Sequence, residues 1–378
     1  MTRPLRIGLI GAGFIGRAHV HGYTAMPVVF PDASAHPVLE LLAEATPELA
    51  AAAAKRLGFR RHTPDWRALV ADPAIDIVDI CVPSNLHREI ALAAIAAGKT
   101  VYCEKPVGLN GGEASEIAAA AGRAGVKSLV GFTYLRNPLI AFARKLIEEG
   151  AIGRLLHIRG AHNEDYLSDP AHPFIWRCDP AIAGKAGALG DLGCHIISIA
   201  QALCGDITDV CGMSRIVVKE RPLARGSTNM RAVANDDEVQ FLAEFASGVT
   251  GHLEASRVAT GSKMDVTYEL TGNEGAIHFD GERMNEIRLY SSRDGADRQG
   301  FRTIYSGPAH PPYGNFVPGA AHGLGFNDHK VIEVQELMEL VAAGRPAGPD
   351  LAGAAQIGRV LDAVLASAEE RRWVRVVP

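Results

Sequence analysis

The stretch Leu5–Gly16 reads LRIGLIGAGFIG and decides the first part of the fold. Its apolar start, Leu5–Ile10, predicts a buried strand, and Phe14–Met26 predicts a helix directly after it. Between the two, the glycines of Gly11–Gly16 form the pattern G-x-G-x-x-G. In a strand–turn–helix context this pattern is typical of dinucleotide-binding units.

Each glycine of the pattern has a physical role in such a unit. Gly11 permits the tight turn, Gly13 lets a pyrophosphate approach the backbone, and Gly16 lets the helix pack against the strand. The N–H groups of Phe14 and Ile15 open the helix and face the phosphates. The alternative is a glycine-rich turn in an α/β domain that binds no nucleotide.

The first third of the chain alternates short apolar strands with alanine-rich helices. The strands are expected at Arg6–Ile10, Val38–Ala43, Ile77–Val82, Thr100–Cys103 and Ser128–Phe132, and further helices at Pro47–Leu57, Leu86–Ala97 and Gly112–Ala124. Strands that alternate with helices pair in parallel and form a doubly wound sheet. We therefore expect an α/β fold that begins with a Rossmann domain over residues 1–132.

The pattern changes after about residue 150. Val239–Phe245 alternates apolar and polar residues, and turns at Ser247–Gly248 and Gly272–Gly275 predict hairpins. Asp328–Ala343 predicts a closing helix, and the glycine- and proline-rich His310–Gly325 predicts a long surface loop. We expect residues 133–378 to form an α+β domain with a mainly antiparallel open sheet, whose last helices can pack back on the first domain.

Length, charge and cysteine content exclude several classes of protein. A chain of 378 residues predicts two domains, and 38 basic against 43 acidic side chains give a net charge of −5. We expect no nucleic acid and no membrane as partners, because no basic field is present and no apolar run approaches about 18 residues. The six cysteines form no C-x-x-C pair, which favours reduced thiols in a cytoplasmic protein and no metal site.

A carboxylate is expected at the end of the second strand. Glu44 stands there, 28 residues after Gly16, and the proline-rich Val28–Pro37 explains the long spacing as an insertion. Glu44 would accept the ribose hydroxyls and repel a 2′-phosphate, and no arginine follows it at 45 or 46. The sequence therefore favours NAD over NADP. The alternative for Glu44 is a solvated residue at a helix start.

Three further side chains are candidates for catalysis. Glu104-Lys105-Pro106 follows a strand, at the edge where open α/β sheets bind ligands. A partly desolvated Lys105 there can handle a hydroxyl proton, although most lysines are only solvated surface charges. Asp191 and His195 are four residues apart and share one face if helical, and an imidazole suits proton removal at neutral pH. The alternatives are a half metal site or a helix cap.

Several motifs in this order resemble the Gfo/Idh/MocA family. Besides G-x-G-x-x-G they are Pro83–His87 (PSNLH), Glu104-Lys105-Pro106, Gly150–Gly153 (GAIG) and Ala188–His195 (ALGDLGCH). The resemblance implies that Lys105, Asp191 and His195 form the catalytic set. It also implies that Pro83, Ser84, Asn85, His87, Glu104 and Lys105 line the nicotinamide ribose end of NAD.

Residues Asp297–Thr303 and Gly307–Pro311 are similar to the levoglucosan dehydrogenase-like members of that family. A polyhydroxylated ring needs hydrogen bonds and an aromatic wall. That mixture is offered by His162, Asn163, Glu164, Tyr166, Trp176 and Arg177, together with Asp191 and His195, and Arg136 is a further candidate.

These observations predict an NAD-dependent oxidoreductase for a secondary alcohol of a cyclic polyol, sugar or anhydrosugar, inositol- or levoglucosan-like, giving a 3-keto sugar. One alternative is a redox-neutral NAD-dependent glycosidase that oxidises C3 transiently, eliminates a substituent and returns the hydride, on a sulfonated or otherwise modified glycoside. Another is a dinucleotide-binding regulator without chemistry. The resemblance also implies a homodimer or homotetramer formed through the open sheet.

Overall fold

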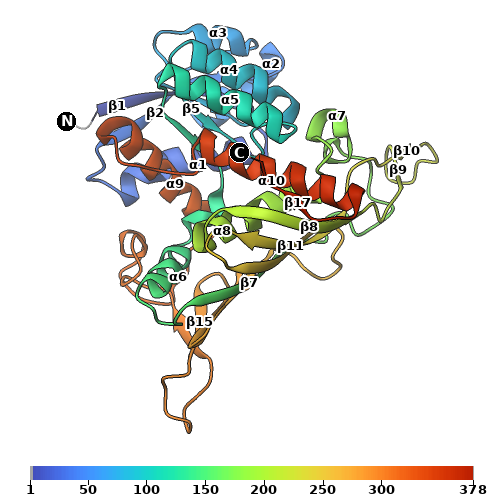
Figure 1. Ribbon diagram of the computed structural model, residues 1–378. Coiled ribbons are helices and arrows are strands. Elements are labelled where there is room, and N and C mark those ends of the chain that lie inside the picture. Colours follow the sequence, from blue (N-terminus) through green and yellow to red (C-terminus); the bar gives the residue numbers. More distant parts are fainter. Residues whose placement is uncertain (1–2, 378) are drawn as a thin grey trace. The chain divides into compact units, whose positions relative to one another are not determined.

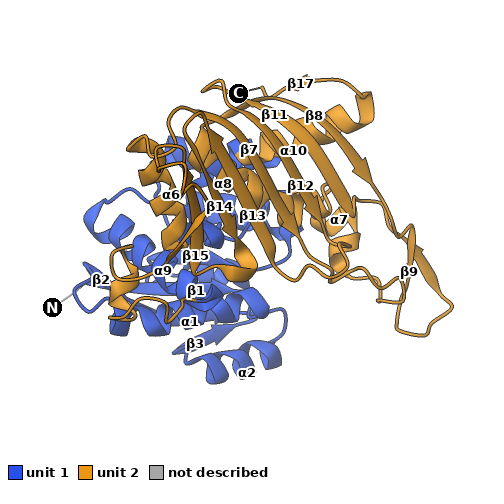
Figure 2. Ribbon diagram, turned by 90° about the horizontal axis from the view of Figure 1, so that it is seen from below, with its two compact units in different colours: residues 1–108, 112–136, 325–356 blue, residues 109–111, 137–324, 357–378 orange. Residues whose placement is uncertain are grey.

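The computed structural model describes residues 3–377 (Figure 1), and the chain divides into two compact units (Figure 2). Unit 1 consists of Met1–Gly108, Gly112–Arg136 and Gly325–Gln356. Unit 2 consists of Leu109–Gly111, Asn137–Leu324 and Ile357–Pro378. Unit 1 thus combines most of the expected first domain with a later segment that the sequence assigned to the second.

Unit 1 is built on a six-stranded parallel sheet with the order β3-β2-β1-β4-β5-β6. Its strands are β1 (Arg3–Ile10), β2 (Ala35–Ala43), β3 (Arg61–Thr63), β4 (Ile77–Ile80), β5 (Thr100–Cys103) and β6 (Ser128–Val130). Its helices are α1 (Phe14–Val29), α2 (Pro47–Leu57), α3 (Trp66–Ala71), α4 (His87–Ala96), α5 (Gly111–Ala124) and α9 (Phe326–Ala343). This is the expected doubly wound Rossmann order.

The centre of this sheet is largely apolar, as a sheet covered by helices requires, although the β4 residue Asp79 is also fully buried. Leu5, Ile7 and Leu9 of β1 are completely buried. The late helix α9 packs along α1: a Cβ added at Gly22 would lie 2.9 Å from the carbonyl oxygen of Lys330. The two helices therefore approach backbone to backbone, which places α9 side chains next to those of α1.

Unit 2 is built on a nine-stranded sheet with the order β16-β15-β14-β13-β7-β12-β11-β8-β17. The strands are β7 (Leu155–Asn163), β8 (Ile207–Arg215), β11 (Glu238–Phe245), β12 (Thr250–Ser256), β13 (Asp265–Gly272), β14 (Gly275–Asp280), β15 (Glu286–Ser291), β16 (Arg302–Tyr305) and β17 (Val374–Arg375). All neighbours pair antiparallel except β7 and β12. The expected mainly antiparallel sheet is confirmed.

Helices cover one face of this sheet. A π-helical turn (Leu189–Gly193) continues into α8 (Cys194–Cys204), which packs on β7 and β12 (Figures 1 and 2). The other helices of unit 2 are α6 (Pro138–Glu148) and α7 (Pro180–Ala183), and β9 (Glu220–Pro222) and β10 (Met230–Ala232) form a separate hairpin. On β11, Val239, Phe241 and Ala243 are buried, whereas Leu242 between them is 49% exposed, so the opposite face of the sheet is open.

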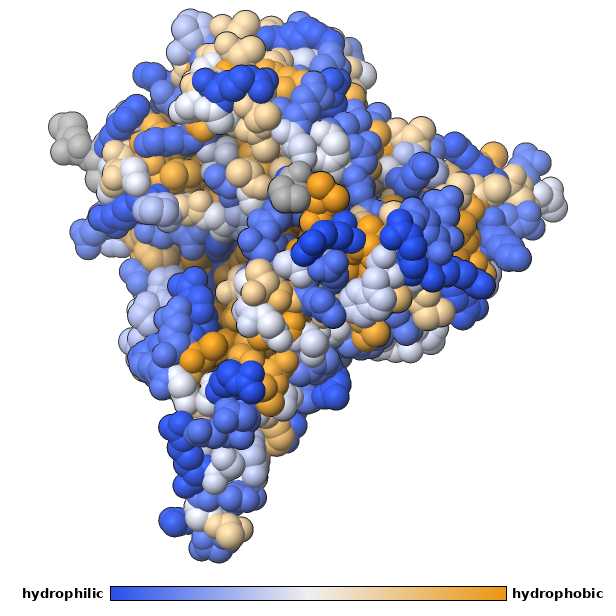
Figure 3. All heavy atoms as spheres, viewed as in Figure 1, coloured by the Kyte–Doolittle hydropathy of each residue, from blue (hydrophilic) through white to orange (hydrophobic). Residues whose placement is uncertain are grey.

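The expected turns and the closing helix are confirmed, but several features differ. The strand β2 begins inside the supposed insertion, and β3, α3 and α10 (Leu351–Glu370) were not expected. The loop His310–Gly325 is organised around Tyr313, a fully buried residue whose hydroxyl accepts the N–H groups of His322 and Gly323. The loop between β15 and β16 has no such buried residue and carries a largely hydrophilic surface (Figures 1 and 3).

Among the described residues, α10 is long and apolar enough to cross a membrane. Half of its apolar window is buried inside the protein. The N–H groups of Gly111 and Gly212 donate to its Asp362 and Ser367 side chains. The core helix of a soluble protein meets the same criterion, and the expected absence of a membrane partner stays a prediction.

Candidate active site

The glycine-rich turn has the geometry that a dinucleotide requires. Gly11 has a φ of +93°, and a Cβ there would lie 2.5 Å from the carbonyl oxygen of Cys81. A Cβ at Gly16 would lie 2.2 Å from the oxygen of Gly11. Both positions therefore exclude a side chain, which keeps α1 tight against the ends of β1 and β4.

Gly13 differs from these two glycines. A Cβ added there would meet nothing within 4 Å, and its backbone is extended, so the protein itself does not demand glycine. Helix α1 begins at Phe14, and its N-cap residue, Gly13, provides no side-chain hydrogen bond to the first turn. Open space in front of a helix N-terminus fits a pyrophosphate, because helical N–H groups and the helix dipole attract anions. Phe14 is 69% exposed, and Ile15 is half-buried.

Glu44 reaches the same turn from the end of β2. Its Oε1 accepts the backbone N–H of Ala12 at 2.7 Å, and its Oε2 accepts that of Ala45 at 3.1 Å. The carboxylate is thus fixed next to the glycine-rich turn, where the sequence placed a ribose ligand. Its contact with a ribose remains a prediction.

The turn Pro83–His87 follows β4. Pro83 and Asn85 are exposed, whereas Ser84 is buried. His87 is also buried, and its Nδ1 and Nε2 lie 2.7 and 2.8 Å from the carbonyl oxygens of Pro106 and Val82. Its imidazole therefore joins this turn to the one after β5, a contribution that the sequence did not suggest.

Glu104 and Lys105 follow β5 at the same edge. Glu104 is buried, and its Oε2 accepts the backbone N–H of Lys105 at 3.2 Å. Burial alone would raise the pKa of the Glu104 carboxyl, but the neighbouring Lys330 and His19 hold it well below its usual range. The turn that carries Lys105 is therefore supported by an ionised carboxylate. Lys105 itself is half-buried.

Unit 2 gathers most of the expected substrate ligands around Asp191. The Asp191 Oδ2 atom accepts the hydroxyl of Tyr166 at 2.8 Å and lies 3.0 Å from Nε of Arg177. The guanidinium of Arg177 in turn stands 4.5 Å above the centre of the Trp176 ring. Burial and the charge of Asp191 raise the pKa of Tyr166 well above its usual value, so this phenol is a hydrogen-bond donor.

His195 lies one turn further along the same helical segment and is buried. Its ring centre is 5.4 Å from that of His162 on β7. His162 contacts the carbonyl oxygen of Leu192 through Nδ1 at 3.1 Å and the carboxylate of Glu164 through Nε2 at 3.3 Å. Two imidazoles and two carboxylates therefore lie close to each other within unit 2.

Asn163 does not join this group, although the sequence placed it there. Its Nδ2 donates to Glu254 at 2.8 Å and lies 3.4 Å from Asp265, on neighbouring strands. Successive side chains of a strand point to opposite faces, so His162 faces α8 and Asn163 faces the open side. Arg136 is also elsewhere: it bonds to Gly348 and Glu336 in unit 1.

Sequence reasoning missed the support of the Asp191–His195 segment. The buried carboxylate of Asp236 accepts the N–H groups of Gly187 and Leu189 at 2.7 and 2.8 Å, where the π-helical turn begins. The adjacent Asp237 forms a fully buried ion pair with Arg257. The signal in the sequence was the polar run Asn235–Asp237 before an apolar strand. Carboxylates rarely become buried without partners.

These features define an NAD-binding oxidoreductase, and the chain belongs to the Gfo/Idh/MocA family. Residues 5–132 match the oxidoreductase family with an NAD-binding Rossmann fold, and residues 140–278 match the GFO/IDH/MocA C-terminal domain.

Individual relatives are similar over most or all of the chain. Levoglucosan dehydrogenase of Pseudarthrobacter phenanthrenivorans is 42% identical over 98% of both chains. A solved levoglucosan dehydrogenase in complex with NADH and levoglucosan is 43% identical, with a TM-score of 0.96 over 100% of both chains. D-apiose dehydrogenase of Paraburkholderia graminis is 29% identical over 80% of this chain and 72% of its own.

The glycine turn yields a test of cofactor binding. We expect Gly13→Val to fold normally, since a Cβ there meets no protein atom, but to weaken NADH binding by about tenfold or more, roughly 1.4 kcal/mol. Melting temperature and NADH fluorescence titration measure the two effects. Gly122→Val is the control, because its Cβ also meets nothing within 4 Å. Wild-type affinity in Gly13→Val would contradict the assignment.

Glu44 yields a test of cofactor choice. A carboxylate held beside the dinucleotide turn repels a 2′-phosphate, so we expect Glu44→Ser to raise the NADP/NAD ratio of kcat/KM by about tenfold or more. The measurement is initial rate with each cofactor. Glu48→Ser, an exposed position on the following helix, serves as control. An unchanged ratio in Glu44→Ser would remove Glu44 from the cofactor site.

Proposed function

We propose that this protein is an NAD-dependent dehydrogenase of a levoglucosan-like anhydrosugar, with 3-keto sugar as product. The single observation that carries the proposal is the group in unit 2 in which Tyr166 and Arg177 both bind Asp191 and in which the centre of the His162 ring lies 5.4 Å from that of His195. Similarity to levoglucosan dehydrogenase over the whole chain supports the same substrate class.

The polar atoms of this group suit a ring that offers several hydroxyls but little apolar surface. Asp191, already fixed by two donors, and Glu164 provide acceptors, whereas Arg177 and Tyr166 provide donors. Trp176 offers an aromatic surface beside them. Fixed donors and acceptors discriminate strongly between sugars, because a hydroxyl that fails to bond leaves a buried group without a partner.

Each catalytic side chain is assigned one task. His195 accepts the proton of the reacting hydroxyl, and Lys105 polarises its oxygen and relays the proton. Asp191 keeps the neighbouring hydroxyls oriented, so that the reacting carbon is held in place. NAD supplies the redox chemistry by accepting the hydride. The residues Gly11–Gly16, Glu44 and the turns after β4 and β5 are proposed to hold this cofactor.

The redox-neutral glycosidase is not favoured, because the two relatives named above that act on sugars are dehydrogenases. The discriminating experiment follows reduced cofactor and released aglycone together. We expect levoglucosan with NAD to accumulate NADH in proportion to ketone, and inositols to react more slowly. Aglycone release from a glycoside without net NADH would establish the alternative, and no reaction with any polyol despite tight NADH binding would favour a regulator.

On that confirmed substrate, we expect His195→Ala to lower kcat by about 100-fold or more while leaving NADH affinity unchanged, since a positioned general base contributes about that much. The measurement combines steady-state rates with NADH titration. His157→Ala is the control, because His157 lies on the same sheet and bonds to Thr250 instead. Unchanged turnover in His195→Ala would refute the assignment of the base.

We also propose a cytoplasmic homo-oligomer. The six cysteines are free thiols, which suits a reducing compartment. The open face of the nine-stranded sheet presents Leu242 at 49% exposure, and a second copy of the chain would cover it.

A further inference from the structure

A buried group of charges lies beneath the turn that carries Lys105, entirely within unit 1. Its centre is Lys330 on α9, a fully buried lysine. The Nζ atom of Lys330 lies 2.8 Å from Oε1 of Glu104 and 2.7 Å from Oε2 of Glu333. Tyr102 and Thr133 also donate their hydroxyls to Glu333, at 2.7 and 3.1 Å. The ammonium is thus held between two carboxylates, both of them further anchored.

The group continues to α1 through His19, which is also fully buried. Its Nε2 lies 2.9 Å from Oε1 of Glu104, and its Nδ1 lies 3.0 Å from both carboxylate oxygens of Asp79. Tyr23 donates its hydroxyl to the same Asp79. Three segments distant in the sequence, α1, the end of β5 and α9, therefore meet at one carboxylate, that of Glu104.

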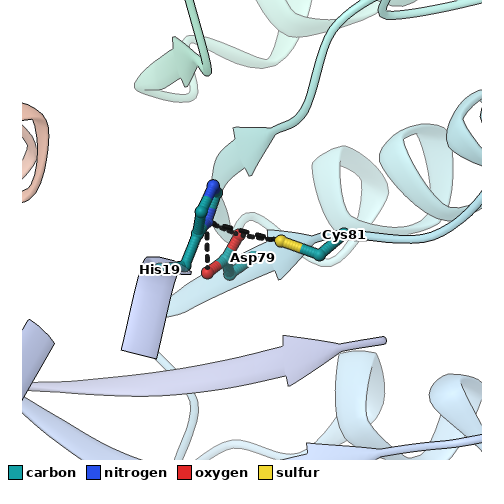
Figure 4. A group of neighbouring side chains, drawn as sticks. All are labelled: His19, Asp79 and Cys81. Atoms are coloured by element: carbon teal, nitrogen blue, oxygen red, sulfur yellow. Dashed lines mark hydrogen bonds and ion pairs between the residues drawn. The ribbon is translucent and has the colours of Figure 1, made fainter. Parts of the chain in front are cut away.

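His19, Asp79 and Cys81 are close enough to suggest a metal site (Figure 4). Their polar atoms are instead bonded to one another: the Cys81 Sγ lies 3.4 Å from both His19 and Asp79. Burial raises the pKa of the Cys81 thiol well above its usual value. The Lys330 ammonium, 3.0 Å from His19, already supplies the cation. The group is a charge network and not a metal site.

The protonation states agree with that interpretation. Burial alone would lower the pKa of Lys330, but Glu104 and Glu333 outweigh it and raise the pKa. Burial likewise opposes a charge on His19, and Asp79 outweighs it. Lys330 and His19 therefore face the carboxylates of Glu104, Glu333 and Asp79 in a buried group, where loss of one charge leaves its partners without compensation.

The network reaches the active site through Glu104. One oxygen of this carboxylate binds Lys330 and His19, and the other accepts the backbone N–H of Lys105. Gly131 on the neighbouring strand end leaves room for it, since a Cβ there would lie 2.4 Å from Oε1. A carboxylate held so tightly cannot turn without breaking several charged hydrogen bonds.

We infer that Lys330 is a positioning residue for the reaction: it fixes the Glu104 carboxylate, which fixes the backbone of Lys105 and thereby the amine that meets the substrate. This inference rests on the proposed role of Lys105. It assigns to α9, which is more than 200 residues after Lys105 in the chain, an indirect influence on turnover.

The experiment compares Lys330→Met with Glu333→Gln. Both remove a charge from the same buried ion pair, but Glu333 contacts neither Glu104 nor Lys105 among the interactions described above. We expect Lys330→Met to lower kcat with levoglucosan about tenfold or more with NADH affinity within twofold, and Glu333→Gln to lower kcat less than threefold. If Lys330→Met does not fold, the double variant Lys330→Met/Glu333→Gln is measured instead, because both members of its ion pair are neutral.

A comparison of Lys330→Met in the wild-type and Lys105→Ala backgrounds distinguishes a positioning role of Lys330 from a general loss of stability. We expect Lys330→Met to have no further effect on kcat in a Lys105→Ala background, because it acts through the missing amine. A loss of the same factor in both backgrounds, or a folded Lys330→Met with wild-type kcat, would overturn the inference.

A measurement that uses no sugar distinguishes a failure of this inference from a failure of the proposed function. Amine-reactive labelling of the enzyme, quantified by mass spectrometry, reports how firmly Lys105 is held. We expect Lys330→Met to label Lys105 about threefold or more faster, with the exposed Lys55 unchanged and Glu333→Gln like the wild type. Equal labelling of Lys105 in all three proteins would contradict the inference even if the true substrate is another sugar.

Discussion

The shared direction of the strands in unit 1 is the constraint on which the site depends. Because β1, β2, β4 and β5 are parallel neighbours, their carboxyl ends lie at one edge of the sheet. The glycine-rich turn, Glu44, the turn Pro83–His87 and Lys105 each follow one of these ends. Direct bonds then fix them: Glu44 to Ala12, His87 to Pro106, and Glu104 to Lys105. A cofactor site arises from loops whose relative positions the sheet already determines.

In unit 2, strand alternation and a π-helical turn fix the positions of His162, Asp191 and His195. The alternation of β7 directs His162 toward α8, and the π-helical turn before α8 presents Asp191 and His195 on consecutive turns. Asp236 holds the start of that segment through two backbone N–H groups. In both units a buried carboxylate supports the backbone next to a residue that we propose to be catalytic: Glu104 does so for Lys105, and Asp236 for Asp191.

The sequence predicted the parts of this architecture that depend on local chemistry. Glycine spacing, apolar periodicity and short motifs identified the Rossmann sheet, the hairpins of unit 2 and the residues around Asp191. The sequence did not predict that Lys330 is buried, because nothing near that residue in the chain distinguishes a buried lysine from a solvated one. Asn163 was misplaced because its neighbours were considered as one polar run, whereas strand alternation separates them. Both failures concern contacts between segments distant in sequence, which local patterns do not contain.

The central claim is that this chain moves a hydride from a sugar carbon to NAD. Levoglucosan carrying deuterium at C3 tests it most directly, with mass spectrometry of both cofactor and sugar after turnover by the purified enzyme. The account predicts that one deuterium appears in the reduced nicotinamide for each 3-keto sugar formed. Deuterium that stays on the sugar, or that is lost to water without reaching the cofactor, would contradict it.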